Sequence, residues 1–480
     1  MVICYATREF FPFYYGGIGS HFYFQMKMMK EKGHQIVFVT VKYDNVDDKS
    51  LNQFWEGIEI VYADKENNAL AAHENFNNSH ILWKTIESLA NSGKFKFDYI
   101  IFPDCGAESF FTLLNKKIFG LFPDTKILME IEGPMKDVAL KNDDFIDGHY
   151  ELTKLMEQFC FANTDFFTTP TAIMWEELKD CIDENIARYE TIPNLVNSDF
   201  TEIMPRRENN KNIFFMGRLE YRKGPDLLFE AVSDMCSSGN YSGIRLQIAG
   251  RDQHWNSYGK TFREYWGEKL NEKQMQCIDY LEFLGHEELK EVLGGAWCAV
   301  FPSRWEPFGN VALESILAGV PVILPKHTGL QEIVGAEYEF LFEAGNKDDL
   351  EDKLKKMINL SEKERSELLV KLRQRGIDLL KISAEKFIEF LMKHQDSVSG
   401  KSERKIDAEQ LYSVFYSLLQ LGGDGIKLYN NTYKDYLNID RLYQEKSRMY
   451  AELEEKFIIV HREHDLMKQY LILLRNREGN

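Results

Sequence analysis

Residues 298–325 read CAVFPSRWEPFGNVALESILAGVPVILP and contain a complete strand–helix–strand unit. The apolar runs 298–302 and 321–325 have the length and composition of buried strands, and 309–319 has the apolar spacing of a helix. Strands that are joined through a helix are usually parallel neighbours in one sheet. This unit therefore predicts an α/β fold built on a parallel sheet.

The same alternation of apolar runs and helical patterns extends through most of the chain. The segments that indicate further strands are 2–6, 35–41, 98–103, 126–131, 213–217, 244–250 and 280–285. The segments that indicate further helices are 18–33, 108–117, 150–162, 225–235 and 287–294. We therefore expect two doubly wound, Rossmann-like α/β domains with helices on both faces of each sheet, facing each other across a cleft.

Two polar stretches divide the chain. Residues 194–212 interrupt the alternation, and residues 396–405 end it. We predict an N-terminal domain at 1–200, a C-terminal domain at 201–395, and a linker with a helical extension at 396–480.

Composition narrows the classes of function. The chain of 480 residues is 44% hydrophobic and carries a formal charge of -18, which argues against a nucleic-acid-binding protein. It has no C-x-x-C pair and no apolar stretch of membrane-spanning length. The seven scattered cysteines are Cys4, Cys105, Cys160, Cys181, Cys236, Cys277 and Cys298. This pattern favours reduced thiols and a cytoplasmic protein, including one held peripherally at the inner face of the membrane.

In open α/β sheets, ligands bind beyond the carboxyl ends of the strands, so the loops there are the places to search for a site. The first of these loops contains Gly16, Gly17 and Gly19 just before a predicted helix. These glycines let the backbone approach a ligand, and the start of the helix offers free N–H groups to an anion. They also suit an ordinary tight turn, and the G-x-G-x-x-G spacing of dinucleotide-binding proteins is missing.

A second loop carries two cations that suit a diphosphate. Arg218 directly follows a predicted strand, and Lys223 precedes a glycine, a proline and a helix. Arginine matches phosphate oxygens with a planar fork, and lysine supplies a point charge. Because Arg222 lies between them, the alternative is a solvated basic turn.

The third loop belongs to the stretch quoted first. Glu306 lies in the loop, and Glu314 lies about five residues into the helix, roughly 7 to 8 Å along its axis. We expect the two carboxylates to bind separate hydroxyl-bearing parts of one ligand. The amides near Phe308, Gly309 and Asn310 would face an anion between them.

The spacing of these glutamates is not informative by itself. Glu343 and Glu351 are also eight positions apart, in a charged and evidently solvated stretch. Only the combination of the three loops describes a cleft for a molecule with a negative centre and hydroxyls at both ends. That molecule is a nucleotide sugar.

Residues 302–323 resemble the donor-site block of the family 4 retaining glycosyltransferases of the GT-B fold, including its E-x7-E element. Residues 214–232 resemble the phosphate-binding block of that family, and 11–40 resemble its opening segment. The resemblance covers roughly residues 1–395. It implies transfer of a sugar, with retention, from a nucleotide diphosphate sugar to a hydroxyl of a glycan, glycolipid or protein.

The resemblance also implies roles for individual residues. Arg218 and Lys223 would bind the donor diphosphate, Glu306 would contact the donor sugar, and Glu314 would hold the ribose. The loop from Gly17 to Gly19 would lie close to the phosphates. A UDP-sugar is the first donor we expect and a GDP-sugar the next, and no metal is expected because the two cations neutralise the diphosphate.

One departure from the family pattern concerns the sugar. Where members of the family carry a histidine that touches the donor sugar, this chain has Glu132. The identity of the transferred sugar is therefore the property most affected.

The acceptor would lie on the N-terminal domain. We expect Tyr15 and His21 to contact it. The aromatic cluster of Phe10, Phe11, Phe13, Tyr14 and Tyr15 would either stack on a sugar ring or pack in the core.

Two other classes of protein remain open. A non-catalytic, glycosyltransferase-like partner subunit or chaperone is favoured by Glu132 and by the long tail, but the retained charged residues argue against it. Within enzymes, an epimerase or a phosphorylase is the alternative. No lysine context typical of pyridoxal phosphate supports the phosphorylase.

The tail carries a stripe with the period of a coiled-coil seam. The positions, which alternate by four and three, are Ile439, Tyr443, Lys446, Tyr450, Leu453, Phe457, Val460, His464, Met467, Leu471 and Leu474. Such a stripe favours self-association or docking to another protein. The alternative is a long helix that packs on the enzyme's own surface.

Overall fold

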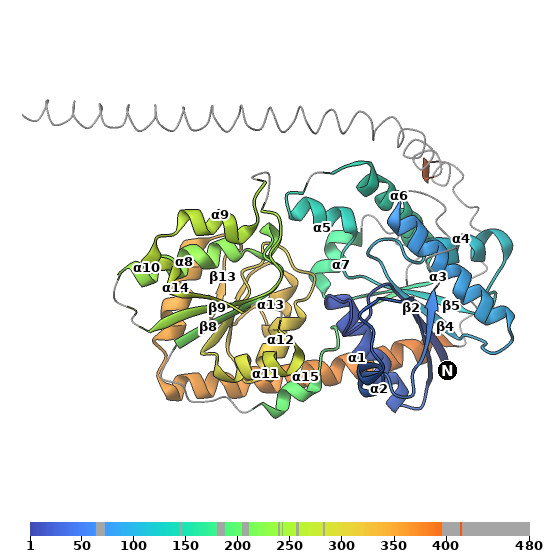
Figure 1. Ribbon diagram of the computed structural model, residues 1–480. Coiled ribbons are helices and arrows are strands. Elements are labelled where there is room, and N and C mark those ends of the chain that lie inside the picture. Colours follow the sequence, from blue (N-terminus) through green and yellow to red (C-terminus); the bar gives the residue numbers. More distant parts are fainter. Residues whose placement is uncertain are drawn as a thin grey trace, which may run out of the picture. The chain divides into compact units, whose positions relative to one another are not determined.

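The computed structural model contains two parallel sheets, each with its own set of helices (Figure 1). It describes residues 1–63, 73–144, 146–179, 188–203, 211–238, 241, 243–255, 259–281, 284–395 and 413–414. The two sheets confirm the predicted two-domain α/β fold. The coiled-coil stripe at 439–474 lies outside the described residues and stays a prediction.

The N-terminal sheet has seven strands in the order β3-β2-β1-β4-β5-β6-β7. These strands are β1 (Val2–Ala6), β2 (Gln35–Val41), β3 (Glu59–Ala63), β4 (Tyr99–Pro103), β5 (Lys126–Glu130), β6 (Phe166–Thr169) and β7 (Arg188–Thr191). All neighbouring strands are parallel, so their carboxyl ends lie along one edge of the sheet. The loops that follow the central strands therefore meet at this edge.

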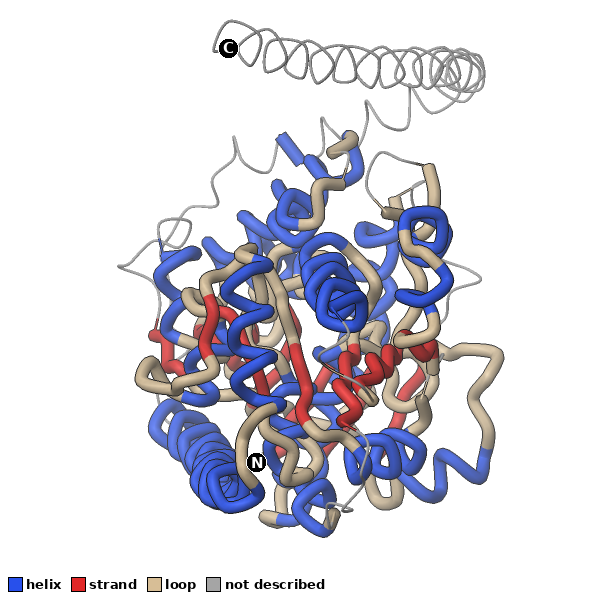
Figure 2. The backbone as a smooth tube through the Cα atoms, turned by 90° about the vertical axis from the view of Figure 1, so that its left-hand side faces the viewer, coloured by secondary structure: helices blue, strands red, loops and turns tan. Residues whose placement is uncertain are grey.

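Helices cover this sheet. Figure 2, which turns the side of the C-terminal domain toward the viewer, shows red strands lying among blue helices. The helices of the N-terminal domain are α1 (Gly17–Glu31), α2 (Asp48–Phe54), α3 (Glu74–Asn91), α4 (Phe110–Phe119), α5 (Met135–Lys141), α6 (Gly148–Asn163) and α7 (Ala172–Leu178). All five residues of the central strand β4 are buried. A strand covered on both faces needs an almost continuous apolar run, which the segment YIIFP provides.

The C-terminal sheet has six strands in the order β10-β9-β8-β11-β12-β13. These strands are β8 (Lys211–Met216), β9 (Ile244–Ala249), β10 (Ile278–Tyr280), β11 (Cys298–Val300), β12 (Val322–Pro325) and β13 (Leu341–Phe342). The helical segments are η2 (Ser198–Glu202), η3 (Tyr221–Lys223), α8 (Pro225–Ser238), α9 (Phe262–Lys269), α10 (Glu272–Met275), α11 (His286–Gly295), α12 (Asn310–Leu317), α13 (Gly329–Val334), α14 (Lys347–Ile358) and α15 (Glu362–Gln395). The central strands β8 and β11 are neighbours, so the loops after them lie side by side.

The long helix α15 contacts both domains (Figure 1). Leu372, near its start, packs in the core of the C-terminal domain. Phe390 and Leu391, near its end, pack in the core of the N-terminal domain, and the hydroxyl of Tyr99 in β4 donates a 2.7 Å hydrogen bond to the carbonyl of Leu391. The helix therefore links the two sheets. The boundaries drawn from the sequence at 200 and 395 stay predictions.

We predict that the end of α15 stabilises the N-terminal domain. Phe390 is 3% exposed and its ring lies 5.9 Å from that of Phe166, so Phe390→Ala should lower the free energy of unfolding by about 3 to 5 kcal/mol. Met392, two residues further on, is 60% exposed, and Met392→Ala is the matched control with an effect within about 0.5 kcal/mol. Chemical unfolding of the variants measures both. Equal and small losses would show that the end of α15 does not support the sheet.

Candidate active site

Lys223 and Glu306 form an ion pair between the loops that follow β8 and β11. The loops can approach each other because Gly224 separates Lys223 from α8. Its φ is +66°, and a Cβ atom there would lie 2.1 Å from the carbonyl oxygen of Pro302. Only glycine fits such a position, so Gly224 allows the contact that brings the two charges together.

The surroundings lower the pKa of both members of this pair. Burial would raise the pKa of Glu306, but the adjacent Lys223 and Arg222 outweigh burial and lower it. Burial lowers the pKa of Lys223, and the Glu306 carboxylate opposes that change. The hydroxyl of Ser303 lies 3.4 Å from the same Glu306 oxygen. A fixed ammonium and a fixed carboxylate therefore lie together at the end of the sheet.

Arg222 and Arg218 have different environments although both contact Glu220. Arg222 is 4% exposed, donates a 2.7 Å hydrogen bond to Glu220, and lies over the ring of Trp305 at 5.6 Å. The alternative of a solvated basic turn is therefore wrong for Arg222. The side chain of Arg218 is 53% exposed and lies 3.3 Å from Glu220. Arg218 can turn toward a ligand, whereas Arg222 supports the loop.

The helix α12 carries Glu314 on a buried face. Its first turn follows Gly309, whose φ of +102° favours glycine, and Glu314 lies one turn later with 8% exposure. Burial raises the pKa of Glu314 to about 8. Burial and the nearby Glu314 carboxyl together raise the pKa of Tyr15 to about 12, so Tyr15 of the N-terminal domain lies close to α12. The ring of Phe308 is buried in the core, which leaves only its backbone for a ligand.

The start of α12 also contacts the start of α1. The side-chain amide of Asn310 donates a 3.0 Å hydrogen bond to the carbonyl of Gly17. The loop before α1 holds an internal carboxylate, because the N–H groups of Gly16 and Gly19 both donate to Glu9, at 2.7 and 2.6 Å. The sequence analysis missed Glu9, although a carboxylate shortly before a glycine-rich helix start is the signal that could have indicated this contact.

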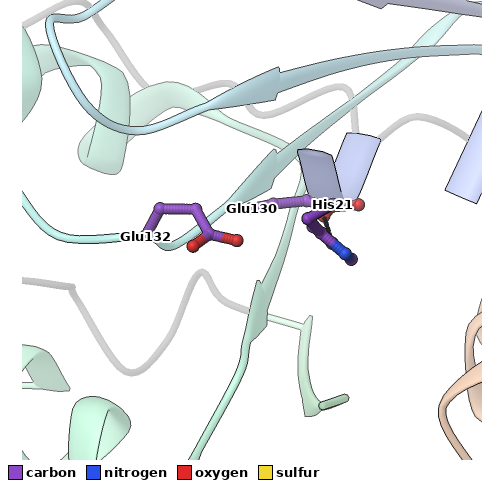
Figure 3. A group of neighbouring side chains, drawn as sticks. All are labelled: His21, Glu130 and Glu132. Atoms are coloured by element: carbon purple, nitrogen blue, oxygen red, sulfur yellow. Dashed lines mark hydrogen bonds and ion pairs between the residues drawn. The ribbon is translucent and has the colours of Figure 1, made fainter. Parts of the chain in front are cut away.

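Glu132 lies beside these helix starts, in the loop after β5. Its N–H donates to Asp104 at 2.8 Å, and its carboxyl group accepts hydrogen bonds of 3.0 and 3.1 Å from the amide of Asn194. Burial raises the pKa of Glu132 to about 8; His21 opposes this shift and Glu130 adds to it. The possible ligand atoms of His21, Glu130 and Glu132 all lie within 4.8 Å of one another (Figure 3).

The residues expected to contact an acceptor lie in different places. His21 is 3% exposed, and its two ring nitrogens have partners inside the protein, Glu130 and Leu195. We therefore treat His21 as part of the Glu132 cluster rather than as an acceptor contact. The ring of Tyr15 lies 4.7 Å from that of Phe11, a core residue.

Within the aromatic cluster, Phe10 and Phe11 pack in the core of the N-terminal domain, and Phe13 packs against it. Tyr14 is exposed and stacks on Tyr43 with ring centroids 4.8 Å apart. Core packing therefore accounts for most of the cluster, and Tyr14 is the member that offers a ring face at the surface.

Of the second glutamate pair, Glu343 is exposed as expected, whereas the side chain of Glu351 is only 15% exposed. Glu343 pairs with Lys326 at an exposed position. Glu351 pairs with Lys355 at 2.6 Å along α14. Neither contact involves the loops after β8 and β11.

Known proteins are similar to this chain in sequence and in fold. Residues 198–376 match the family model of glycosyl transferases group 1. A glycogen synthase of Mycobacterium tuberculosis is 24% identical over 348 residues, which is 70% of this chain and 80% of that protein. A D-inositol 3-phosphate glycosyltransferase of Corynebacterium jeikeium is 27% identical over 236 residues, 46% of this chain and 56% of that protein.

Among solved structures, sucrose-phosphate synthase from Thermosynechococcus elongatus superposes with a TM-score of 0.63 at 15% identity, covering 82% of this chain and 98% of that one. At such low identity the likeness shows the fold, which is that of the GT-B enzymes. The chain therefore has the fold of the GT-B enzymes, and its residues 198–376 match the glycosyl transferases of group 1.

Proposed function

We propose that the protein transfers a sugar, with retention at the anomeric carbon, from a nucleotide diphosphate sugar to an acceptor hydroxyl. The observation that carries this proposal is the Lys223–Glu306 pair, which lies next to the helix whose start contacts α1. A UDP-sugar is the first donor to test and a GDP-sugar the next. Because Lys223 and Arg218 supply positive charge to the diphosphate, the proposal needs no metal.

The proposed roles follow from how charge moves during transfer. Breaking the bond between the sugar and the diphosphate leaves the sugar positive and the diphosphate negative. Lys223 and Arg218 would stabilise the leaving diphosphate, and Glu306 would orient the sugar and support its positive charge. Glu314, buried one turn into α12, would accept hydrogen bonds from the ribose hydroxyls.

The acceptor is proposed only as a class. A hydroxyl of a glycan, a lipid-linked glycan or a protein suits the exposed Tyr14 ring and the nearby Tyr15. Among the described residues, no helix combines the length and the apolar character needed to cross a bilayer. Two further parts of the proposal rest on the sequence. The protein would act in the cytoplasm, including at the inner face of a membrane, and it would associate with itself or with another protein through residues 439–474.

The proposal is tested by incubating the purified chain with UDP-, GDP- and ADP-sugars and measuring the released nucleotide. Turnover of one donor class is the expected result. A chain that binds no donor and releases no nucleotide would instead fit the non-catalytic partner subunit.

We predict that Lys223→Ala lowers kcat/KM by about 10²- to 10³-fold, since losing one preorganised donor to a developing negative charge costs about 2 to 4 kcal/mol. The fold should survive because Arg222 remains 3.9 Å from Glu306. Lys326→Ala is the matched control, because it removes a lysine from an exposed ion pair with Glu343. Steady-state donor hydrolysis measures both variants. Activity within a few-fold of wild type in folded Lys223→Ala protein would exclude the phosphate role.

We predict different effects from the two active-site glutamates. Glu306→Gln should mainly lower kcat, because the carboxylate acts on charge that develops during transfer. Glu314→Gln should mainly raise the dissociation constant of the donor, because Glu314 contacts the ribose hydroxyls of the bound donor before the sugar is transferred. Glu343→Gln serves as the control for a lost surface carboxylate. Nucleotide titration and initial rates separate the two effects, and equal, mild changes in all three variants would contradict both roles.

The two arginines of the loop provide a further prediction. Arg222→Ala should destabilise the protein by about 3 to 5 kcal/mol, because it leaves the buried carboxylate of Glu220 without its close partner. Arg218→Ala should leave stability nearly unchanged and weaken donor binding. Thermal unfolding and donor titration of both variants check this. Stable Arg222→Ala protein would show that the buried pair does not hold the loop.

A further inference from the structure

The cluster of His21, Glu130 and Glu132 contains two carboxyl groups. Among the residues that the structure describes, the side chains that contact them do not supply two positive charges to balance them. The cluster lines a small cavity together with Gln25. The buried Oε1 atoms of Glu130 and Gln25 have no hydrogen-bond partner. Within the described residues, no lysine or arginine forms an ion pair with Glu130 or Glu132, so either a proton or a bound cation must offset the charge.

The hydrogen bonds of His21 decide between these possibilities. The backbone N–H of Leu195 can only donate and lies 2.8 Å from Nδ1, whereas the Leu195 carbonyl oxygen lies farther from Nδ1, at 3.4 Å, so we assign the lone pair to Nδ1. The ring proton is therefore on Nε2, which lies 2.8 Å from Oε2 of Glu130. An imidazole in this state has no free lone pair for a metal.

In the described part of the chain, the groups that face Glu132 are acidic or polar. Burial would lower the pKa of His21, but Glu130 and Glu132 outweigh burial and raise it. His21 faces it from α1 and Glu130 from β5, and their possible ligand atoms lie within 4.8 Å of the Glu132 carboxyl. Asp104 follows β4 and accepts the Glu132 N–H, while Asn194 donates to the carboxyl from the segment that connects the domains. When two carboxyl groups lie this close, one of them tends to keep a proton. Glu132 is that group, since Glu130 already accepts the His21 proton.

Glu132 is also placed to reach the donor. The amide of Asn194 that donates to Glu132 lies 3.3 Å from the side-chain oxygen of Asn310, and Asn310 contacts Gly17. Glu132 thus lies at the meeting point of α1 and α12, only partly buried. Glu306 lies four residues before Asn310. The start of α12 therefore links Glu132 to the loop that carries Glu306, the loop at which the proposed donor sugar would bind.

We propose that Glu132 keeps a proton at neutral pH and presents a neutral carboxyl group, both donor and acceptor, to a hydroxyl of the transferred sugar. This makes Glu132 a specificity-determining residue, and the sugar-binding part rests on the proposed function. The substrate class is a neutral hexosyl donor with a hydroxyl at this position. A uronic acid donor, whose carboxylate would face Glu130 and Asp104, is excluded.

The pH dependence follows from the same charges. Burial raises the pKa of Glu132 from 4.5 to about 8. Between these two pH values, Glu132 binds a proton in the folded protein and has released it in the unfolded chain. The contribution of this proton to the free energy of unfolding is complete below about pH 4.5 and is lost as the pH rises through about 8. The donor KM should rise over the upper part of this range, as the proton leaves.

Infrared difference spectroscopy tests the protonation without any donor. The expected result at pH 7 is a carboxylic acid C=O band in wild-type protein that is missing from Glu132→Gln and retained in the control Glu343→Gln. The melting temperature of the wild-type protein should fall between pH 6 and 9, and this fall should be smaller in Glu132→Gln. A spectrum in which Glu132→Gln removes no such band would overturn the proposal. A second outcome would also overturn the proposal. If adding Mg²⁺, Mn²⁺ or Zn²⁺ to chelator-treated wild-type protein abolished the band, a cation rather than a proton would fill the cluster.

Donor kinetics test the sugar contact separately. Glu132→Gln cannot lose a proton in this range, so the ratio of its KM at pH 9 to its KM at pH 7, for a neutral hexosyl donor, should fall to about one, whereas the ratio for wild-type protein exceeds one. Uronic acid donors should give at least ten-fold lower kcat/KM than the neutral donor. Equal use of both donors, or a KM in wild type that does not change with pH, would contradict the contact. Absence of all turnover, with the infrared band present, would instead contradict the proposed function.

Discussion

The ion pair between Lys223 and Glu306 is the contact around which the candidate active site is arranged. It joins two loops that follow neighbouring strands, and it exists because Gly224 lets these loops touch. Fixed charges stabilise a transition state most when little reorganisation is needed during the reaction. Lys223 is already held in place by Glu306, so a diphosphate would meet a positioned cation. The same contact keeps Glu306 ionised despite its burial.

The loop that carries Glu306 is supported from both domains. Arg222 and Trp305 pack together behind it, and the hydroxyl of Thr171 in the N-terminal domain donates a 2.8 Å hydrogen bond to the carbonyl of Pro307. Nearby, the carboxylate of Glu332 accepts hydrogen bonds from two N–H groups in the first turn of α7. A carboxylate at a helix start is stabilised by the partial positive charge there. These contacts connect the donor loop to the domain proposed to hold the acceptor.

The sequence was sufficient to predict the central strands and much of the site, because both depend on local patterns. Continuous apolar runs indicated β1, β2, β4 and β5. No such run was recognised for β3, whose residues are mostly half-buried, or for the short strands β6, β7 and β13. Lys223 and Glu306 were expected to act on one ligand because both lie at the carboxyl ends of parallel strands.

Contacts between distant parts of the chain were not predictable in this way. His21 and Glu130 are 109 positions apart, and Asn194 and Glu132 are 62 positions apart. No local spacing marks these pairs. The burial of Arg222 also depends on Trp305, which reaches it from a different loop. Such contacts arise only when the strands of each sheet assemble and bring the loops at their carboxyl ends together.

A crystal structure of the protein with a bound nucleotide diphosphate tests the central claim most directly. The account predicts the diphosphate within hydrogen-bonding distance of Lys223 and Arg218, between the starts of α1 and α12, with the ribose at Glu314. A nucleotide bound elsewhere, with no phosphate oxygen near Lys223, would contradict it.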